Sequence, residues 1–576
     1  MLSWLRIFSR SSRAAAGARA LALHAQGVSE NRAGRHREAA SLLVAAIDAD
    51  PAVAEIHYEL GRAMQALAEP ARAVTCFRKA IEIDPAHRDA HIDLASALLA
   101  LGDPAGAERE ARAALAIDAD SVPAHANLGA AQEGQGKFAE AAESYRRTLG
   151  FDPDYVPALA NLSTVCLRLG AIDEAAHCAE RALSIAPLNP EVHVRRGNVL
   201  MEQRAPAQAA ESFREAMRLQ PGAAALCNSL GFAYEMQGQL ERALQSYEQA
   251  IGLDPENVQA HVNRAAIWII QEDYARGWQE YEWRLRSTGH APLYERFGQP
   301  RWDGSSLAGR KILVYAEQGL GDEILFASCL PEILAQAAHG VIDCDPRLAA
   351  LYRRSFPQAT VHSGRQSDAT DRLAGAGPID FRIPAGSLPL HLRRTPGDFP
   401  RHAGYLRADP ERVAAWRKRL EGLGPGRKIG LAWRGGVPQT GRGSRSLSLA
   451  ELLPVLRLGG LAFVNLQYDR CSEELAALRE QHGIEVHHWQ EAIDDYDETA
   501  ALVCALDLTL SVCTAVVDLG GALGRPVWVM APVRTDFRYG LKGESMRWYP
   551  SVRMFRQQRY GDWDPVIGAV AEALAR

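Results

Sequence analysis

The sequence lacks the metal-binding and redox signatures that cysteine often brings to a chain of 576 residues. Its nine cysteines are scattered, no two of them form a CxxC pair, and no cluster of histidines completes a zinc site. Unclustered cysteines are more typical of a reducing compartment than of a disulfide framework. We therefore expect no metal site and a cytoplasmic location.

Long apolar runs and an excess of positive charge are missing as well. No stretch of eighteen apolar residues occurs, so we predict no membrane-spanning helix, and the N-terminus lacks the pattern of a signal peptide. The formal net charge of -6 argues against a general nucleic-acid binder. Only residues 1–19 are basic, and this segment is interpreted as a frayed helical start, with peripheral membrane contact or a transit peptide as alternatives.

What the sequence does contain is a period of thirty-four residues. Proline ends helices and biases the preceding residue away from helical geometry, so regularly spaced prolines mark unit boundaries. Small residues on the same grid indicate where two helices approach closely. The prolines are Pro51, Pro85, Pro153, Pro187, Pro221 and Pro255, and the small residues are Ala39, Ala73, Ala107, Ala141, Ala175, Ala209 and Ala243.

These positions resemble the consensus of the tetratricopeptide repeat family. The resemblance covers residues 20–257 as seven units, and residues 258–291 resemble a degenerate capping pair in which Gly277 stands where alanine is expected. It implies an all-α superhelix whose concave face, lined by the first helix of each pair, holds a protein or peptide.

One position of each first helix points to that groove. It carries asparagine in three units, and an amide both donates to and accepts from an extended peptide backbone. In protein O-GlcNAc transferases an asparagine ladder at this register grips the acceptor, so the resemblance implies acceptor binding here. The alternative is that these are solvated polar residues. The three are Asn127, Asn161 and Asn263.

The second half alternates short β-branched runs with amphipathic helices, which predicts parallel α/β architecture. Strands are expected at 311–316 and 340–344 in a first Rossmann-like lobe, residues 292–407, with one helix through ILFASCLPEILAQA between them. Further strands are expected at KIGLAW, LAFVNLQ, GIEVHHW, LDLTLSV and RPVWVMAP in a second lobe, residues 408–576.

Ligands of such sheets bind beyond the carboxyl ends of the strands. After the first strand the loop contains Gln318, Gly319 and Gly321, but Ile324 replaces the third glycine of a dinucleotide fingerprint, which argues against a nicotinamide cofactor. In the second lobe a helix opens near Thr514, where free N–H groups predict an anion site suited to a diphosphate. The candidate residues for binding a diphosphate-containing donor molecule are Gln318, Gly319, Gly321, Arg434, Arg445, Ser511, Cys513, Thr514, Ala515 and Asp518.

Several motifs of the second half are similar to those of glycosyltransferases related to the heptosyltransferase family. They are AEQGLGDEILF, GLAWRGG, RSLSLAEL, LDLTLSVCTAVVDLGGALGRPVWVMAP and WYPSVRMFRQ. The resemblance implies a two-lobed B-type fold, a nucleotide sugar bound in the second lobe, and inverting transfer that needs no metal. By position it assigns the general base to Asp322, with Glu323 as fallback. The alternative for Asp322 is a helix cap.

Two residues depart from that family. Cys513 stands where the family has Asp or Asn, and Asp518 where it often has His. An aspartate beside a diphosphate is unfavourable unless it points away, bonds a ribose or remains protonated, so Asp518 puts donor binding in doubt. Cys513 is interpreted as a packed thiol rather than a nucleophile. The aromatics of residues 536–550 are expected either to stack on a ligand or to pack in the core.

Two hypotheses of different class follow. The first is a glycosyltransferase that holds a protein acceptor in its repeat groove and transfers a sugar from a nucleotide donor. The second is a non-catalytic interaction scaffold with a degenerate glycosyltransferase domain. A third possibility is a glycan or lipid-linked acceptor. Asp343 and Asp345 imitate a metal-binding DxD but are interpreted as a loop residue and a helix cap.

Overall fold

The protein is described here from a computed structural model. It describes the backbone of all residues except 1, 288–296, 365–376 and 437–444. Outside those gaps it describes the side chains from residue 16 onward. The chain divides into two compact units, residues 1–203 and 204–576. The first unit is built from helices, whereas the second contains further helix pairs and two β-sheets. Helix α1 runs through the predicted basic segment, but the side chains of Arg6, Arg10 and Arg13 lie outside the described part.

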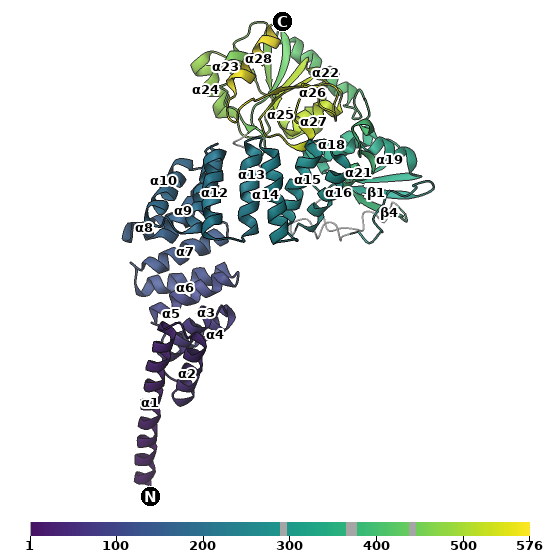
Figure 1. Cartoon of the computed structure of the whole chain (residues 1–576). Coiled ribbons are helices and arrows are strands. Elements are labelled where there is room, and N and C mark those ends of the chain that lie inside the picture. The colour runs from purple at the N-terminus through teal and green to yellow at the C-terminus, as the bar shows by residue number, and fades with distance from the viewer. Residues whose placement is uncertain (1, 288–296, 365–376, 437–444) are drawn as a thin grey trace. The chain divides into compact units, whose positions relative to one another are not determined.

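Successive helix pairs form the first unit, and each pair corresponds to one thirty-four-residue unit of the sequence (Figure 1). The predicted repeat is therefore confirmed. The helices are α1 (Leu2–Arg32), α2 (His36–Ala49), α3 (Ala54–Ala66), α4 (Pro70–Ile83), α5 (Arg88–Ala100), α6 (Pro104–Ile117), α7 (Val122–Gly134), α8 (Phe138–Phe151), α9 (Val156–Leu169), α10 (Ile172–Ile185) and α11 (Pro190–Glu202).

The small residues of the grid lie where helices touch. Ala73, Ala107 and Ala141 are fully buried. A Cβ added to Gly129 would lie 2.7 Å from Cε1 of Tyr145, which is closer than carbon atoms pack, so the aromatic ring rests directly on the glycine backbone. The close approach of the two helices in a pair thus depends on glycine or alanine at these positions.

A histidine series, which the sequence analysis missed, fastens the turns between units. In five units Nε2 lies 2.8–3.2 Å from the carbonyl oxygen six residues earlier, at the grid position. Because a carbonyl only accepts, Nε2 must donate its proton, which satisfies a carbonyl of the turn. The histidines are His57, His91, His125, His193 and His261.

The second unit begins with more helices of the same kind. The predicted capping pair, residues 258–291, corresponds to the last two, and its Gly277 is explained by space, because a Cβ there would lie 2.9 Å from the backbone nitrogen of Ile269. The elements are α12 (Pro206–Leu219), α13 (Ala224–Met236), α14 (Leu240–Leu253), α15 (Val258–Ile270), α16 (Tyr274–Tyr281) and the 3-10 helix η1 (Glu282–Arg286).

A parallel sheet follows with the strand order β3-β2-β1-β4 among the described residues. Its strands are β1 (Lys311–Tyr315), β2 (His339–Asp343), β3 (Thr360–His362) and β4 (Phe381–Pro384). The single helix predicted through residues 324–337 was wrong: the chain forms α18 (Leu320–Ala327) and α19 (Leu330–Gln336), because Pro331 starts a new helix at its first turn. Further elements are η2 (Pro346–Leu348), α20 (Ala349–Ser355), η4 (Ala385–Ser387), α21 (Leu388–Leu392) and η5 (Pro396–Asp398).

A second parallel sheet has the order β10-β9-β8-β5-β6-β7 in the described part of the chain. Both sheets confirm parallel α/β architecture, although the sequence analysis did not predict β3, β4 or β10. The strands are β5 (Arg427–Ala432), β6 (Leu461–Asn465), β7 (Val486–His487), β8 (Leu508–Val512), β9 (Val527–Ala531) and β10 (Val552–Arg556). The helices are α22 (Pro410–Glu421), α23 (Leu453–Leu456), α24 (Ser472–His482), α25 (Gln490–Asp494), α26 (Tyr496–Ala505), α27 (Ala515–Ala522), η8 (Phe537–Tyr539) and α28 (Asp564–Ala575).

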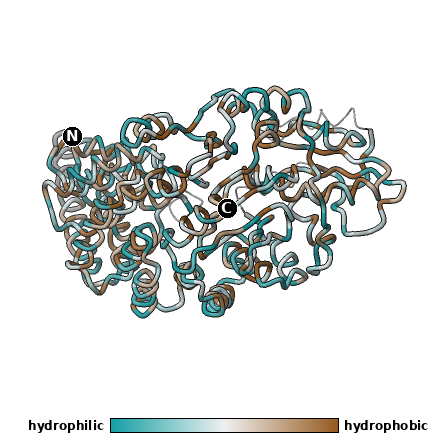
Figure 2. The backbone as a smooth tube through the Cα atoms, turned by 90° about the horizontal axis from the view of Figure 1, so that it is seen from above, coloured by the Kyte–Doolittle hydropathy of each residue, from teal (hydrophilic) through white to brown (hydrophobic). Residues whose placement is uncertain are grey.

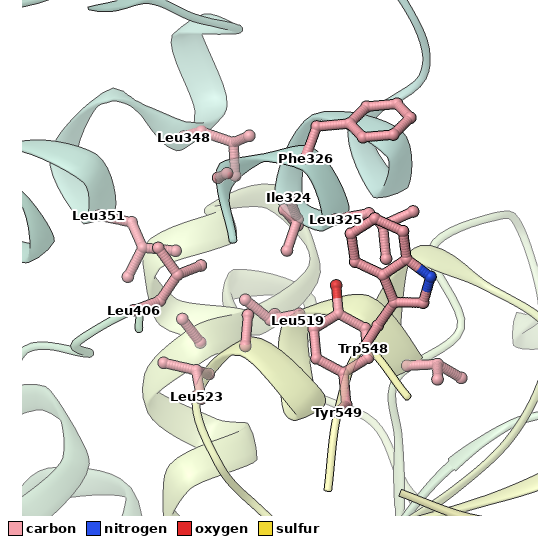
Figure 3. Packing of buried hydrophobic residues seen from close by; sticks show 14 of the residues in the cluster. Ile324, Leu325, Phe326, Leu348, Leu351, Leu406, Leu519, Leu523, Trp548 and Tyr549 are labelled. Atoms are coloured by element: carbon pink, nitrogen blue, oxygen red, sulfur yellow. The ribbon is translucent and has the colours of Figure 1, made fainter. Parts of the chain in front are cut away.

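One hydrophobic core joins the parts of the second unit. Trp278 of α16 packs edge-on against Phe326, Phe537 and Trp548, and its indole N–H donates to the carbonyl of Arg393. Figure 3 shows that α18 and α27 share this core. Figure 2 shows hydrophobic and hydrophilic segments alternating along the chain, and among the described residues no helix is long and apolar enough to span a membrane.

Candidate functional site

The two sheets place their crevices at definable points. In a parallel sheet the crevice lies where the strand order reverses, which is between β1 and β4 in the first sheet and between β5 and β8 in the second. The loop after β1 leads into α18, and the loop after β8 leads into α27. The predicted site residues on these two loops therefore follow the carboxyl ends of β1 and β8.

Helices α18 and α27 bring these two loops together. A Cβ at Gly321 would lie 2.7 Å from Oδ2 of Asp518 and 3.4 Å from Cα of Ala515, so only glycine allows this contact. Behind it, Ile324 and Leu325 of α18 pack with Leu519 of α27 in the buried cluster of Figure 3. The first turns of the two helices thus form a single site, in which Gly321, Ala515 and Asp518 are neighbours.

Arg538 is the centre of this site, although the sequence analysis gave it no role. Its Nη1 donates to Asp518 over 3.0 Å, its Nη2 donates to Asp322, and its Nε donates to Asp536 over 3.0 Å. The arginine side chain is only 8% exposed. We call Arg538, Asp322, Asp518 and Asp536 the carboxylate cluster. It joins α18 of the first lobe to α27 and η8 of the second.

The three carboxylates share one guanidinium, and they differ in how strongly their surroundings oppose the ionised form. Burial raises the pKa of Asp518 to about 7, despite the attraction of Arg538. Its Oδ1 is buried and has no hydrogen-bond partner among the described residues. Burial also works to raise the pKa of Asp536, but Arg538 outweighs it and that pKa is lowered. Of the three ways in which Asp518 could tolerate a diphosphate, protonation is therefore the one that its surroundings favour.

Asp322 is part of a helix cap, the alternative interpretation of this residue, and also pairs with Arg538. Its Oδ2 accepts a hydrogen bond from the backbone N–H of Gly319 over 3.1 Å, which caps α18, and its Oδ1 accepts from Arg538. Its side chain is 26% exposed, so solvent or a substrate can reach it. Glu323, the fallback, is buried and accepts from the backbone N–H of Asp345, which gives it a structural role.

The remaining loop residues of the first lobe and the predicted cations divide between the site and its surroundings. Gln318 exchanges hydrogen bonds with the hydroxyl of Tyr281 in α16. The guanidinium of Arg434 pairs with Glu474 and with Asp469, the latter over 2.8 Å, so its charge is already neutralised. Arg445 lies near Cys513, because a Cβ at Gly435 would be 2.7 Å from the backbone oxygen of Cys513 and 3.5 Å from Cγ of Arg445.

The segment from 511 to 516 is arranged as a helix start. Thr514 is the N-cap of α27, and its Oγ1 accepts from the backbone N–H of Val516 over 3.3 Å. Ser511 is buried and contacts the same hydroxyl over 3.0 Å. The N–H group of Val516, one of those expected to bind an anion at this helix start, is therefore bonded by the chain itself. Burial raises the pKa of Cys513 to about 12, so the thiol stays protonated at neutral pH, as expected for a packed cysteine.

The aromatic residues of the 536–550 segment pack in the core. Phe537 lies edge-on to Trp278 and Tyr281, and Trp548 is 3% exposed. Of the two alternatives, core packing is the one that the structure shows. Asp345 caps η2, as interpreted from the sequence, and no group of three or more His, Cys, Asp or Glu residues within the described ranges is placed to hold a metal ion.

The three predicted asparagines all bond within the repeats. Nδ2 of Asn127 donates to the carbonyl of Ile92 over 2.9 Å, and the amide of Asn161 bonds the hydroxyl of Tyr145. Asn263 donates to Asn228 over 3.0 Å. All three are half-buried, so each amide is oriented by a neighbour while part of it faces solvent.

Comparison with known proteins identifies the helical half. Models of the tetratricopeptide repeat match residues 24–87, 69–131, 134–195 and 224–257. The helical half consists of tetratricopeptide repeats. Such repeats are protein-interaction modules.

Protein FlbA of Caulobacter vibrioides is 36% identical over 373 residues, which cover 62% of this chain and 62% of that protein. The chain thus spans less than two thirds of this curated relative. The match is longer than the whole helical half, so the similarity extends into the α/β half. Solved structures similar to the repeats include YrrB, a TPR protein with an unusual peptide-binding site (22% identity, TM-score 0.27, 32% of this chain and 95% of that one). A thermophilic TPR protein of Thermus thermophilus, TTC0263, is another (22%, TM-score 0.29, 32% and 99%).

Proposed function

We propose that the protein is a glycosyltransferase with a two-lobed B-type domain, which holds a protein acceptor through its repeats and transfers a sugar from a nucleotide donor. The observation that carries this proposal is the position of Asp322. It is a part-exposed carboxylate at the carboxyl end of β1, and it faces the first turn of α27 across the contact between the two lobes. A base and an anion-binding helix start are the two groups that inverting sugar transfer needs at one place.

The chemistry assigns each group one task. The acceptor hydroxyl oxygen attacks the anomeric carbon, the bond from that carbon to the nucleotide diphosphate breaks, and the hydroxyl proton passes to Asp322. The hydrogen bonds from Gly319 and Arg538 hold the carboxylate in place. The N–H groups at the start of α27 stabilise the charge on the departing diphosphate.

A non-catalytic scaffold is the second candidate, and one observation favours it. Arg538 donates to three aspartates at once, and Arg434 is paired with two acids. The charges of both guanidinium groups are therefore already balanced by carboxylates, which weakens their attraction for a diphosphate. In this candidate the carboxylate cluster only ties the two lobes together, and the repeats carry the whole function.

Incubation of the full chain with labelled UDP-, GDP-, ADP- and CMP-sugars separates the two candidates. We expect hydrolysis or transfer with one donor class, and a fall of about 10²- to 10⁴-fold in rate for Asp322→Asn, which keeps the shape of the side chain but removes its basicity. Asp303→Asn changes an exposed carboxylate of the same lobe and serves as control. Absence of binding to every donor would leave only the scaffold.

A further inference from the structure

The repeats contain one arrangement of four residue types twice. Glycine, glutamate, tyrosine and asparagine recur at an offset of three units: Gly129, Glu133, Tyr145 and Asn161 in the first unit of the chain, and Gly231, Glu235, Tyr247 and Asn263 in the second. We call these the first and second Glu–Tyr pockets. Each spans the first helix of a pair, the second helix of the same pair and the first helix of the next.

The second pocket shows what the arrangement binds. Nε of Arg534, from the loop after β9, donates to Oε1 of Glu235 over 2.8 Å, and its guanidinium lies 5.0 Å from the centre of the Phe232 ring. The other oxygen, Oε2, accepts from the hydroxyl of Tyr247 over 2.8 Å. Glu235 is therefore held by a buried tyrosine on one side and presents its second oxygen to an arginine.

The first pocket repeats these supporting contacts. The hydroxyl of Tyr145 donates to Oε2 of Glu133 over 3.0 Å, and Tyr145 is fully buried. The asparagines differ, because Asn161 bonds the hydroxyl of Tyr145 whereas Asn263 donates to Asn228. In both pockets the tyrosine ring lies on glycine, since a Cβ would be 2.7 Å from Tyr145 or 2.6 Å from Tyr247. Glu133 is half-buried, and among the described residues its side chain accepts from Tyr145 but forms no ion pair.

From these two observations we infer that the first pocket binds an arginine side chain of a polypeptide partner, in the way the second pocket binds Arg534. Glu133 supplies the carboxylate, and Tyr145 fixes its orientation before the partner arrives, which lowers the entropy cost of binding. Arginine fits because its guanidinium donates in a fixed plane and remains charged. This inference gives the chemistry of the partner in the proposed function, on which it rests.

Two differences between the pockets define the ligand further. Ala130 stands where the second pocket has Phe232, so the first pocket has no ring under the guanidinium and more room for the partner's backbone. Arg195 lies close enough to act on Tyr145, but its own charge is paired with Glu191 over 2.7 Å. The first pocket is thus a more open site that depends on the carboxylate of Glu133 alone.

Peptide binding to the full chain tests the inference. The probe is a fluorescein-labelled peptide with the sequence of residues 531–540, APVRTDFRYG, beside an analogue with alanine in place of Arg534. We expect fluorescence anisotropy to show binding of the first peptide, and Glu133→Gln to weaken it about tenfold or more, because a charge-assisted hydrogen bond is lost. The control is Glu143→Gln, an exposed glutamate on α8.

A second measurement covers the case in which Glu133→Gln unfolds the repeats. With p-benzoylphenylalanine at Ala130, light should crosslink the arginine peptide and leave the alanine analogue uncoupled. Equal affinity of wild type and Glu133→Gln, or equal crosslinking of both peptides, overturns the inference. The sugar-donor assay on the same preparation reports separately on transfer, so failure of one does not imply failure of the other.

Discussion

Hydrogen-bonded residues are close together in the sequence in the repeats, whereas in the α/β half they can be far apart. In the repeats Tyr145 bonds Glu133, twelve residues earlier, and the grid histidines bond a carbonyl six residues earlier. In the α/β half Arg538 bonds Asp322, which is 216 residues away. Repeat contacts are therefore local and recur, whereas the contacts of the candidate site form once and only when both lobes have folded.

Burial of charge differs in the same way. Arg146 and Glu174 join two neighbouring repeats, and their side chains are 46% and 37% exposed. Arg538 and Asp518 are 8% and 2% exposed. Water screens the first pair but not the second, so the loss of one partner should cost far more at the site than in the repeats.

The largest effect should follow from Arg538→Met. The change leaves the buried Asp518 and the part-exposed Asp322 and Asp536 without their counter-charge, and we expect a loss of about 3 to 5 kcal/mol of stability. Urea unfolding followed by tryptophan fluorescence measures it, because ten of the eleven tryptophans lie between residues 268 and 563 and none between 5 and 267. An unchanged midpoint would mean that the carboxylate cluster does not hold the lobes together.

The same contrast explains what the sequence could predict. The repeat follows from residues such as Pro51, Pro85 and Ala73, because each unit makes its own contacts and a period in the sequence becomes a period in space. The loops that carry Asp322 and Thr514 were predicted as ligand-binding loops because parallel strands present their carboxyl ends to ligands. Long buried strands such as β8 were predicted from their apolar runs, whereas the three-residue β3 gave too short a signal.

Arg538 could not be assigned a role from the sequence. It lies two residues after Asp536 in the short helix η8, and nothing local in the sequence indicates that Asp322 and Asp518 meet there. The pairing of Arg434 with Asp469 and Glu474 is equally long-range. The offset between the two Glu–Tyr pockets was present in the sequence as Glu133 and Glu235, but its meaning depends on Arg534 bonding only one of them.

A second test uses pH to separate the buried site from the repeats. The pKa of Asp518 is raised from an ordinary 3.8 to about 7 in the folded state. Between these two pH values the folded state therefore keeps a proton that the unfolded state has lost. The contribution of Asp518 to the free energy of unfolding is therefore highest below about pH 4. It declines as pH rises and is constant above about pH 7. Relative to Asp518→Asn, the wild type should lose on the order of 2 to 4 kcal/mol across that range. Parallel curves for both proteins in urea titrations would contradict this.

A third test concerns glycine in the repeats. At Gly61 an added Cβ would overlap the ring of Phe77, whereas at Gly150, also helical, nothing lies within 4 Å. We expect Gly61→Ala to destabilise by about 1 to 3 kcal/mol through overpacking. Gly150→Ala should stabilise by about 0.5 to 1 kcal/mol, because alanine favours helix. Circular dichroism at 222 nm during urea unfolding measures both free energies. If both substitutions stabilised the protein, the ring of Phe77 would be shown to move aside easily.

The smallest effect should come from Arg146→Ala. Its guanidinium donates to both oxygens of Glu174 over 2.8 Å, a geometry as good as that of Arg538, but both side chains are largely in water. We expect a loss below about 1 kcal/mol, which 1 M salt removes by screening. The measurement is again urea unfolding by circular dichroism, at low and high salt. A loss as large as that of Arg538→Met would show that bond geometry rather than burial sets the cost, and the contrast between the two halves would then fail.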